Sequence, residues 1–218
     1  MEHRVYRPRM ALHIYINSIS PNARRVRMLA IELGLEVEWH ELDFQKGEHK
    51  AAPNMQRNAN GKVPTLVDGD FMLWESNAIN QYLADSSPNG GTIYPKDLKQ
   101  RAEVHRWQFW TTAHLSPALS MLAYERFLKK FVEKKDADPT MVAWADGQWK
   151  RFAAVLDQQL ATREWVAGNA LTLADLAVAP TFGFRTQSGL DLTPFPNVTA
   201  YLARVEARPS WQQTKPPF

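Results

Sequence analysis

Signals for β-strands are confined to the first part of this chain, and every periodic segment after residue 91 has the spacing of a helix. Apolar residues alternate over residues 12–16, which predicts a strand, and they recur with helical spacing over residues 21–33. Alternation returns over residues 37–42 and in two short segments before Glu75, near which the next helical segment begins. This division restricts the chain to a mixed α/β unit followed by a wholly helical unit.

The densest cluster of turn-forming residues, Asp85-Ser-Ser-Pro-Asn-Gly-Gly91, predicts the link between the two units. We expect a first domain over residues 11–85, with a loop or short helix between its second and third strands, and a helical domain over residues 97–210. The helical spacing of the second domain predicts long helices over residues 97–114, 117–135, 139–162, 172–187 and 196–207. Residues 1–10 are basic and are expected to form a loose extension.

Thr172-Leu-Ala-Asp175 has the pattern of a capping box at the start of one of these helices. In such a box the threonine hydroxyl accepts a hydrogen bond from an amide of the first turn, and the acidic side chain reaches back to the threonine amide. The sequence therefore predicts a helix that begins at this threonine.

The absence of cysteine among the 218 residues excludes disulfides, thiolate metal ligands and a cysteine nucleophile. Any thiol chemistry must therefore use the sulfur of another molecule. The six histidines show no HExxH or comparable ligand spacing, so we expect no metal. A formal net charge of +3, with basic and acidic residues interspersed, argues against nucleic acid. No segment resembles a signal peptide or could span a bilayer, so we expect a cytoplasmic protein with no membrane partner.

Hydroxyl groups stand directly before the first helix, in Ser18-Ile-Ser-Pro-Asn-Ala-Arg-Arg-Val26. Unpaired N–H groups and the positive end of the helix dipole at this position stabilise a nearby anion, such as a thiolate. A hydroxyl that donates a hydrogen bond to the sulfur lowers the pKa of the thiol. The alternative for Ser20 is a plain helix N-cap.

Three later segments offer further polar groups. The proline of Val63-Pro64 stands at the mouth of the third strand, and a cis bond there would turn the valine backbone outward to pair with an extended peptide. Glu75-Ser76 provides a helix start that suits a carboxylate, and Gly47-Glu-His-Lys50 offers two cations to a second carboxylate. Each segment also has an ordinary structural explanation, as a sheet edge, a helix cap or a solvated loop.

In their order and spacing these segments resemble the glutathione-site motifs of serine-type glutathione transferases, most closely those of the plant phi class and its bacterial relatives. The motifs that carry the resemblance are Ser20-Pro-Asn-Ala-Arg-Arg-Val26, Gly47-Glu-His-Lys50, Asn60-Gly-Lys-Val-Pro64 and Asp68-Gly-Asp-Phe-Met-Leu-Trp-Glu-Ser-Asn-Ala-Ile79. Thr172-Leu-Ala-Asp175 resembles the capping box of the family, and the likeness covers about residues 11–210. The resemblance and the element order imply an α/β thioredoxin-like N-terminal domain followed by an all-α C-terminal helical domain.

The resemblance implies that Ser20 is the catalytic residue and donates to the thiolate of glutathione. Ser18, two residues upstream, and Tyr15, comparable with the tyrosine of other classes, are rivals that lie further from the helix start. Asn22 completes a Ser-Pro-Asn sequence similar to the Thr-Pro-Asn of relatives that reduce disulfides with glutathione. In those relatives the asparagine helps to hold the sulfur.

The resemblance also implies a cradle for the rest of glutathione. Glu75 would meet the ammonium group of the γ-glutamyl unit, and Ser76 would meet its carboxylate. The backbone of Val63-Pro64 would pair with the cysteinyl unit. His49-Lys50 would hold the glycine carboxylate, together with Lys62, where phi enzymes often carry glutamine.

A hydrophobic electrophile would bind where the second domain faces the thiolate. Trp107, Trp110, Thr111 and His114 share one helix face by their spacing. Trp107 is expected to belong to the core, and Trp110 and His114 are the candidates for the wall of the electrophile site.

The expected function is that of a glutathione transferase, which conjugates glutathione to a hydrophobic electrophile. One alternative is a glutathione-dependent disulfide or peroxide reductase. Another is a non-catalytic interaction module of the same fold. The family implies a homodimer, with residues 71–74 as a contact.

Overall fold

The structure is a computed structural model that describes residues 11–217. Residues 1–10, expected to form an extension, lie outside the described residues. The first domain contains a four-stranded mixed sheet, whose strands stand in the order β2-β1-β3-β4. Its strands are β1 (Leu12–Ile16), β2 (Val37–Glu41), β3 (Thr65–Asp68) and β4 (Phe71–Trp74). The predicted α/β unit is confirmed.

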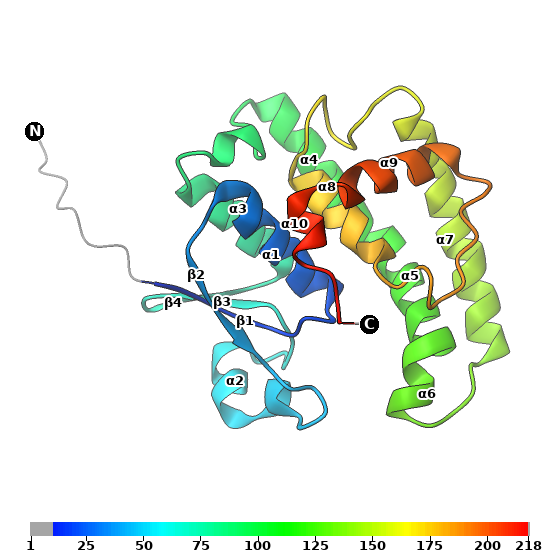
Figure 1. Ribbon diagram of the computed structural model, residues 1–218, viewed down its shortest axis with the longest axis horizontal. Coiled ribbons are helices and arrows are strands. Elements are labelled where there is room, and N and C mark those ends of the chain that lie inside the picture. Colours follow the sequence, from blue (N-terminus) through cyan, green and yellow to red (C-terminus); the bar gives the residue numbers. More distant parts are fainter. Residues whose placement is uncertain (1–10, 218) are drawn as a thin grey trace, which may run out of the picture.

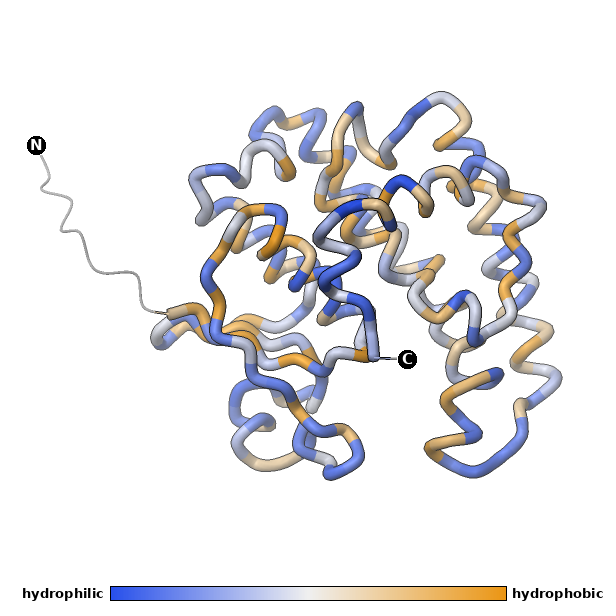
Figure 2. Tube along the Cα trace, in the orientation of Figure 1, coloured by the Kyte–Doolittle hydropathy of each residue, from blue (hydrophilic) through white to orange (hydrophobic). Residues whose placement is uncertain are grey.

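Helices cover both faces of this sheet. Figure 1 shows α1 (Pro21–Leu33) and α3 (Ser76–Ser86) on one face and α2 (Ala52–Arg57), preceded by a 3-10 turn (Glu48–Lys50), on the other. β1 runs parallel to β2 and antiparallel to β3, and β3 runs antiparallel to β4. Figure 2 shows hydrophobic segments along these strands and on the helices packed above them. Ile14, Leu29 and Leu66 are fully buried between the sheet and the helices, so apolar burial holds the layers together.

The second domain is helical, as predicted. Its helices are α4 (Leu98–Trp110), α5 (Ser116–Ala123), α6 (Lys129–Val132), α7 (Pro139–Leu160), α8 (Leu173–Val178), α9 (Pro196–Glu206) and α10 (Pro209–Gln212). No helix among residues 11–217 is long and apolar enough to cross a membrane.

Two predicted helix boundaries in this domain are wrong. The expected break after residue 114 is absent, because π-helical turns over Thr111–Leu115 and Tyr124–Leu128 connect α4, α5 and α6. Pro117 lies at the junction where the π-helical turn passes into α5, so the N–H that it lacks is missing where the hydrogen-bond pattern changes. The helix expected over residues 172–187 ends at Val178 and continues only as a 3-10 turn over Ala179–Phe182, because Pro180 removes a backbone donor.

The capping box at Thr172 is confirmed. The Thr172 hydroxyl accepts a hydrogen bond from the amide of Ala174 at 3.2 Å, and Asp175 Oδ2 accepts from the Thr172 amide at 2.8 Å. The other oxygen of Asp175 accepts from the amide of Val166 at 2.9 Å. Burial raises the pKa of Asp175 to about 6, although these hydrogen bonds act in the opposite direction.

The last described segment of the chain packs on α1, as the adjacent blue and red ribbons in Figure 1 show. The guanidinium of Arg24 lies 3.5 Å from the ring centroid of Trp211 and donates to the Trp211 carbonyl at 3.1 Å. At the other end of the helix, the Glu32 carboxylate accepts two hydrogen bonds from Arg208, at 2.8 and 2.7 Å. The helix that follows Ser20 is therefore anchored at both ends by residues beyond α9.

Candidate functional site

The turn between β1 and α1 uses its two serines differently. The amide and the hydroxyl of Ser18 donate to the Glu41 carboxylate at 2.6 and 2.9 Å. The hydroxyl of Ser20 instead accepts from the Ala23 amide at 3.3 Å, as the N-cap of α1. Ser20 therefore retains its hydroxyl hydrogen for an acceptor at the helix start, whereas Ser18 has committed its own.

Tyr15, the other rival, lies away from this helix start. Its ring stacks on His40, with centroids 4.5 Å apart, and the Arg57 guanidinium lies 4.1 Å from its centroid. Because alternate residues of a strand face opposite sides, Tyr15 belongs to the sheet face opposite the buried Ile14 and Ile16.

A small cavity separates the serine turn from the second domain. Its lining comprises Ser18, Ile19, Ser20, Pro21, Arg24, Pro180, Gly183, Phe184 and Pro216. The surface that faces Ser20 is therefore built from the segment after α8 and from residue 216. Phe184 and Pro216 were not predicted to lie at this site, since no local pattern connects them with the serine turn.

A second cavity, of about 130 Å³, lies between the start of α1 and the start of α3. It is lined by Asn22, Asn58, Asn60, Lys62, Val63, Pro64, Glu75 and Ser76. Six of the eight residues predicted to bind glutathione are thus brought together, from segments up to 54 positions apart along the chain. The lining offers three side-chain amides, one ammonium group and one carboxylate, which suits a charged peptide.

The loop before β3 is shaped by Asn58. Its side-chain amide donates to the Lys62 carbonyl at 3.0 Å and to the Thr65 hydroxyl at 3.2 Å. The Val63–Pro64 bond is cis, as predicted. Within residues 11–217 the backbone N–H and C=O of Val63 have no hydrogen-bond partner. They are available to an extended peptide in the cavity.

Glu75 has a backbone conformation that the sequence did not indicate. Its φ is +71°, in the left-handed region that residues other than glycine rarely adopt. Such a conformation costs on the order of 1–3 kcal/mol and is concentrated at functional sites. It turns the chain from β4 into α3 and places the Glu75 carboxylate at the cavity.

Arg25 is a buried cation behind the turn at Glu75. It was not predicted as a site residue. Its guanidinium donates to Asn77 at 3.3 Å, and its Nε has no hydrogen-bond partner among the described residues. Burial lowers the pKa of Arg25 to about 10, and the negative charge of Glu75 partly opposes that effect. The guanidinium is charged at neutral pH and therefore favours anions at the start of α3.

His49 and Lys50 lie beside the cavity and not in its lining. A Cβ added to Gly61 would lie 3.4 Å from the His49 carbonyl oxygen and 3.5 Å from Lys50 Cγ. The 3-10 turn that carries both residues therefore packs against the loop next to Lys62. The ring of His49 packs on Phe44, with centroids 4.6 Å apart.

Trp110 and His114 are not brought into either cavity. Trp110 packs edge-on against Trp107 and Phe152, and the exposed His114 stacks on the same Phe152 with centroids 5.2 Å apart. Trp110 lines a different cavity, of about 650 Å³, between α4 and α7. Trp107 is buried, as expected.

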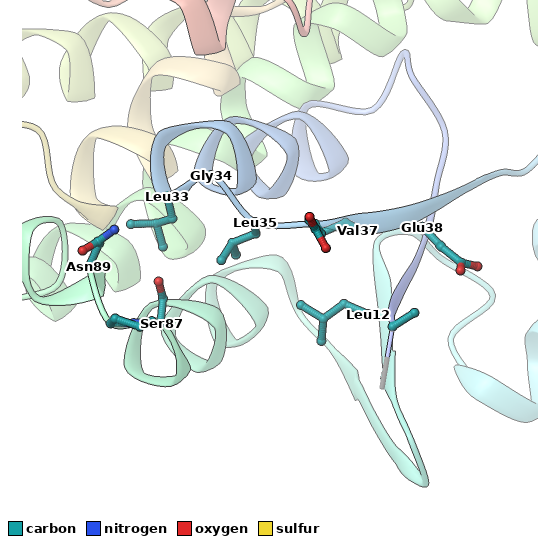
Figure 3. Close-up of a pocket in the computed structure, with 11 residues that line it drawn as sticks. Leu12, Leu33, Gly34, Leu35, Val37, Glu38, Ser87 and Asn89 are labelled. Carbon is teal, nitrogen blue, oxygen red and sulfur yellow. The ribbon is translucent and has the colours of Figure 1, made fainter. Parts of the chain in front are cut away.

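A further cavity, of about 630 Å³, lies at the opposite end of β1 from the serine turn. Figure 3 shows Leu12, Leu33, Ser87 and Asn89 among its walls. It shares no lining residue with the two cavities at the starts of α1 and α3. The predicted site residues therefore belong to the other end of the first domain.

Comparison with known proteins gives matches over most of the chain. Residues 10–85 match the family model of the glutathione S-transferase N-terminal domain, and residues 114–209 match that of the C-terminal domain. The chain is 32% identical over 212 residues to the probable glutathione S-transferase GSTF2 of Oryza sativa subsp. japonica, covering 94% of this chain and 98% of that relative. It is also 32% identical over 205 residues to human glutathione S-transferase theta-2, covering 91% of this chain and 82% of that relative.

Solved structures give the same result. A theta class glutathione S-transferase from the citrus canker pathogen Xanthomonas axonopodis pv. citri, crystallised with glutathione bound, superposes with a TM-score of 0.85 at 28% identity, covering 94% of this chain and 97% of that one. Glutathione transferase F7 from Populus trichocarpa has the same fold, with a TM-score of 0.85 at 23% identity over 94% of this chain and 97% of that one.

Proposed function

Since this chain belongs to the glutathione S-transferase family and is a glutathione transferase, we propose that it activates the glutathione thiol at Ser20 and transfers the sulfur to a hydrophobic electrophile. The observation that supports this proposal is the polar cavity between the starts of α1 and α3, which gathers six predicted residues beside the serine turn. In the reaction the thiol proton passes to solvent, the sulfur bonds to the electrophilic carbon, and the leaving group departs with its electron pair.

Ser20 is the proposed partner of the thiolate because its hydroxyl accepts the Ala23 amide and still has a hydrogen to donate. A hydrogen bond to the charged sulfur, combined with the dipole of α1, lowers the pKa of the thiol. Ser18 is the weaker candidate, since its hydroxyl donates to Glu41. Asn22, from the first turn of α1, lines the adjoining cavity and would contact the same sulfur or the cysteinyl unit.

The proposed cradle positions the two ends of glutathione. Glu75 pairs with the ammonium group, and Ser76 with the first amides of α3 holds the neighbouring carboxylate. The unpaired backbone groups of Val63, before Pro64, bind the cysteinyl unit in strand fashion. The cations of Lys62 and of His49-Lys50 hold the glycine carboxylate.

The electrophile is proposed to enter from the cavity between the serine turn and the second domain. Pro180, Phe184 and Pro216 give this side an apolar surface facing Ser20. Trp110 and His114 line neither cavity. Their place in the wall of the electrophile site therefore remains a prediction. The cavity at the serine turn holds only about 10 Å³ and must widen to admit a co-substrate, and the apolar side chains on this side favour a hydrophobic one.

The role of Glu75 can be tested with Glu75→Gln. The wild-type protein is expected to conjugate glutathione to an aryl halide, and this variant is expected to raise the KM for glutathione about tenfold, because a charge-assisted hydrogen bond contributes about 1.5–3 kcal/mol. Steady-state rates at varied glutathione measure the effect. Glu36→Gln, which removes a carboxylate from the cavity at the far end of β1, should leave the KM unchanged. An unchanged KM in Glu75→Gln would exclude Glu75 from the cradle.

The reductase alternative rests on Asn22 in the cavity and uses the same site. There two glutathione thiols would be oxidised to glutathione disulfide, while a disulfide or peroxide substrate takes up the two electrons and two protons. Rapid turnover of a mixed disulfide or hydroperoxide, with little transfer to an aryl halide, would favour this activity. Failure to bind immobilised glutathione would favour the interaction module.

We also propose that the chain forms homodimers through the edge strand β4. Phe71, Met72 and Trp74 are 44%, 49% and 45% exposed, and such apolar side chains on a strand at the edge of the described sheet mark an association surface. We expect sedimentation equilibrium to give twice the chain mass, and Trp74→Lys to shift the population to the monomer. A wild-type monomer at micromolar concentration would contradict the proposal. A cytoplasmic location remains a prediction.

A further inference from the structure

His13, Glu38 and His40 meet on the sheet face opposite α1, where Tyr15 and Arg57 also lie. β1 and β2 pair in parallel, so that His13 stands opposite Glu38 and Tyr15 opposite His40. Alternate residues of a strand share a face, and the buried Leu12, Ile14 and Ile16 occupy the other face of β1. The register therefore brings two imidazoles and a carboxylate together from strands far apart in the sequence.

The ligand atoms of these side chains lie close together. His13 Nδ1 lies 3.0 Å from His40 Nε2 and 3.1 Å from Glu38 Oε2, and the three ligand atoms all lie within 4.8 Å of one another. A hydrogen on His13 Nδ1 or on His40 Nε2 can serve only one of these two close contacts well, so at least one pair of acceptor atoms is left facing each other. Metal–ligand distances of about 2.1 Å give ligand separations of roughly 3.0–3.4 Å at right-angled or tetrahedral geometry, which matches the two shortest separations.

Neighbouring side chains hold the His40 ring in place, and the exposure of His13 and Glu38 leaves room for an ion to enter. The His40 ring is stacked on Tyr15 with an interplanar angle of 16°, and Tyr15 is covered on its own side by Arg57. The side chains of His13 and Glu38 are 36% and 60% exposed, so that water can complete the coordination of a cation. Figure 3 shows Glu38 at the far end of the neighbouring cavity from Asn89.

We propose that His13, Glu38 and His40 bind one zinc ion or a similar divalent transition metal. Two imidazoles and one carboxylate form a nitrogen and oxygen donor set that suits zinc, cobalt and nickel, whereas calcium and magnesium prefer oxygen ligands alone. The expectation of no metal rested on spacings within single segments, whereas His13 and His40 stand 27 residues apart on paired strands.

Metal binding here would act as a clip between β1 and β2. Glu41, directly after His40, holds the amide and the hydroxyl of Ser18 in the serine turn. An ion that joins the two strands binds the folded state alone, and it therefore raises the stability of the strand pair that supports this turn.

Zinc titration of the full chain by isothermal calorimetry tests the proposal. The parent protein in these titrations is His3→Gln, and every other variant is made in it. His3 lies outside the described residues, and its imidazole could bind zinc independently of the proposed site. We expect one ion per chain, with affinity at least about tenfold weaker in His13→Gln and in His40→Gln and a smaller loss in the exposed Glu38→Gln. His105→Gln is the matched control, since His105 bonds to the Tyr94 hydroxyl elsewhere in the fold, and it should bind zinc as the parent does.

Cobalt provides a second readout that does not depend on enzyme activity. Its visible absorption should change when it binds the parent and should be lost in His40→Gln, while circular dichroism shows that the variant is folded. The proposal is overturned if the His3→Gln parent protein binds no zinc at about 100 μM free zinc, which is about 100 times a micromolar dissociation constant. It is also overturned if affinity is unchanged in both ligand variants, or falls equally in His105→Gln. If a histidine variant does not fold, retention of full affinity by Glu38→Gln decides against the site.

Discussion

Replacing Ser20 with alanine is expected to lower kcat/KM for conjugation of an aryl halide by about 100-fold, the effect of removing one donor that stabilises charge at a reacting atom. The hydroxyl is the group at the start of α1 that accepts from the Ala23 amide and keeps its own hydrogen for a sulfur. Without it the thiolate keeps only the dipole of α1 and nearby polar groups. The variant should therefore bind glutathione while reacting slowly.

Two measurements separate this role from a structural one. The ultraviolet absorbance of the thiolate, followed against pH, should show a higher pKa for bound glutathione in Ser20→Ala than in the wild type. Ser18→Ala is the matched control, because its hydroxyl is bonded to Glu41, and it should change the rate by less than about threefold. An unchanged rate in Ser20→Ala would remove Ser20 from the mechanism and leave the helix dipole as the source of activation.

Asp175→Ala is expected to lower the free energy of unfolding by about 3 kcal/mol, since it leaves buried donors without acceptors. The carboxylate accepts from the amides of Val166 and Thr172 and from the Thr172 hydroxyl, in fully buried surroundings. Urea denaturation measures the change. Asp191→Ala, which removes an exposed local cap of Thr193, should cost less than about 1 kcal/mol.

The pH dependence of the free energy of unfolding separates the effect of the Asp175 charge from the effect of its hydrogen bonds. The folded-state pKa of about 6 lies above the usual 3.8, so stability from the protonated carboxyl is complete below about pH 4 and is lost as pH rises through about 6. Asp175→Asn does not titrate, and its stability relative to wild type should therefore improve by up to about 3 kcal/mol between about pH 4 and pH 7. A difference that is constant over this range would show that the carboxyl has an ordinary pKa.

Much of the fold follows from local patterns that packing does not override. The alternation in β1 and the helical spacing of α1 coincide with their buried residues, and Gly34 ends α1 in the left-handed conformation. The capping box at Thr172 and the cis bond before Pro64 were also predictable, because each depends on neighbouring residues. The polar cavity brings together Asn22, Val63 and Glu75, whose association the family motifs implied.

The remaining features depend on contacts between segments distant in the sequence. The left-handed backbone of Glu75 and the burial of Arg25 arise where α3 packs on α1, and neither residue type indicates this by itself. Phe184 and Pro216 line the cavity at the serine turn although they stand more than 160 positions later in the chain. The π-helical turns on either side of α5 keep the chain helical past Pro117, and no local pattern indicated them.

The anchoring of α1 by Trp211, Thr214 and Arg208 also concerns the order in which the protein matures during synthesis. Arg24 bonds to residues 187 and 190 positions later in the chain. While the ribosome is still adding the helical domain, the nascent first domain must carry the Arg24 guanidinium and, at the other end of the helix, the Glu32 carboxylate that pairs with Arg208, both in water. The helix that begins beside Ser20 therefore acquires its final support only after translation has passed residue 214.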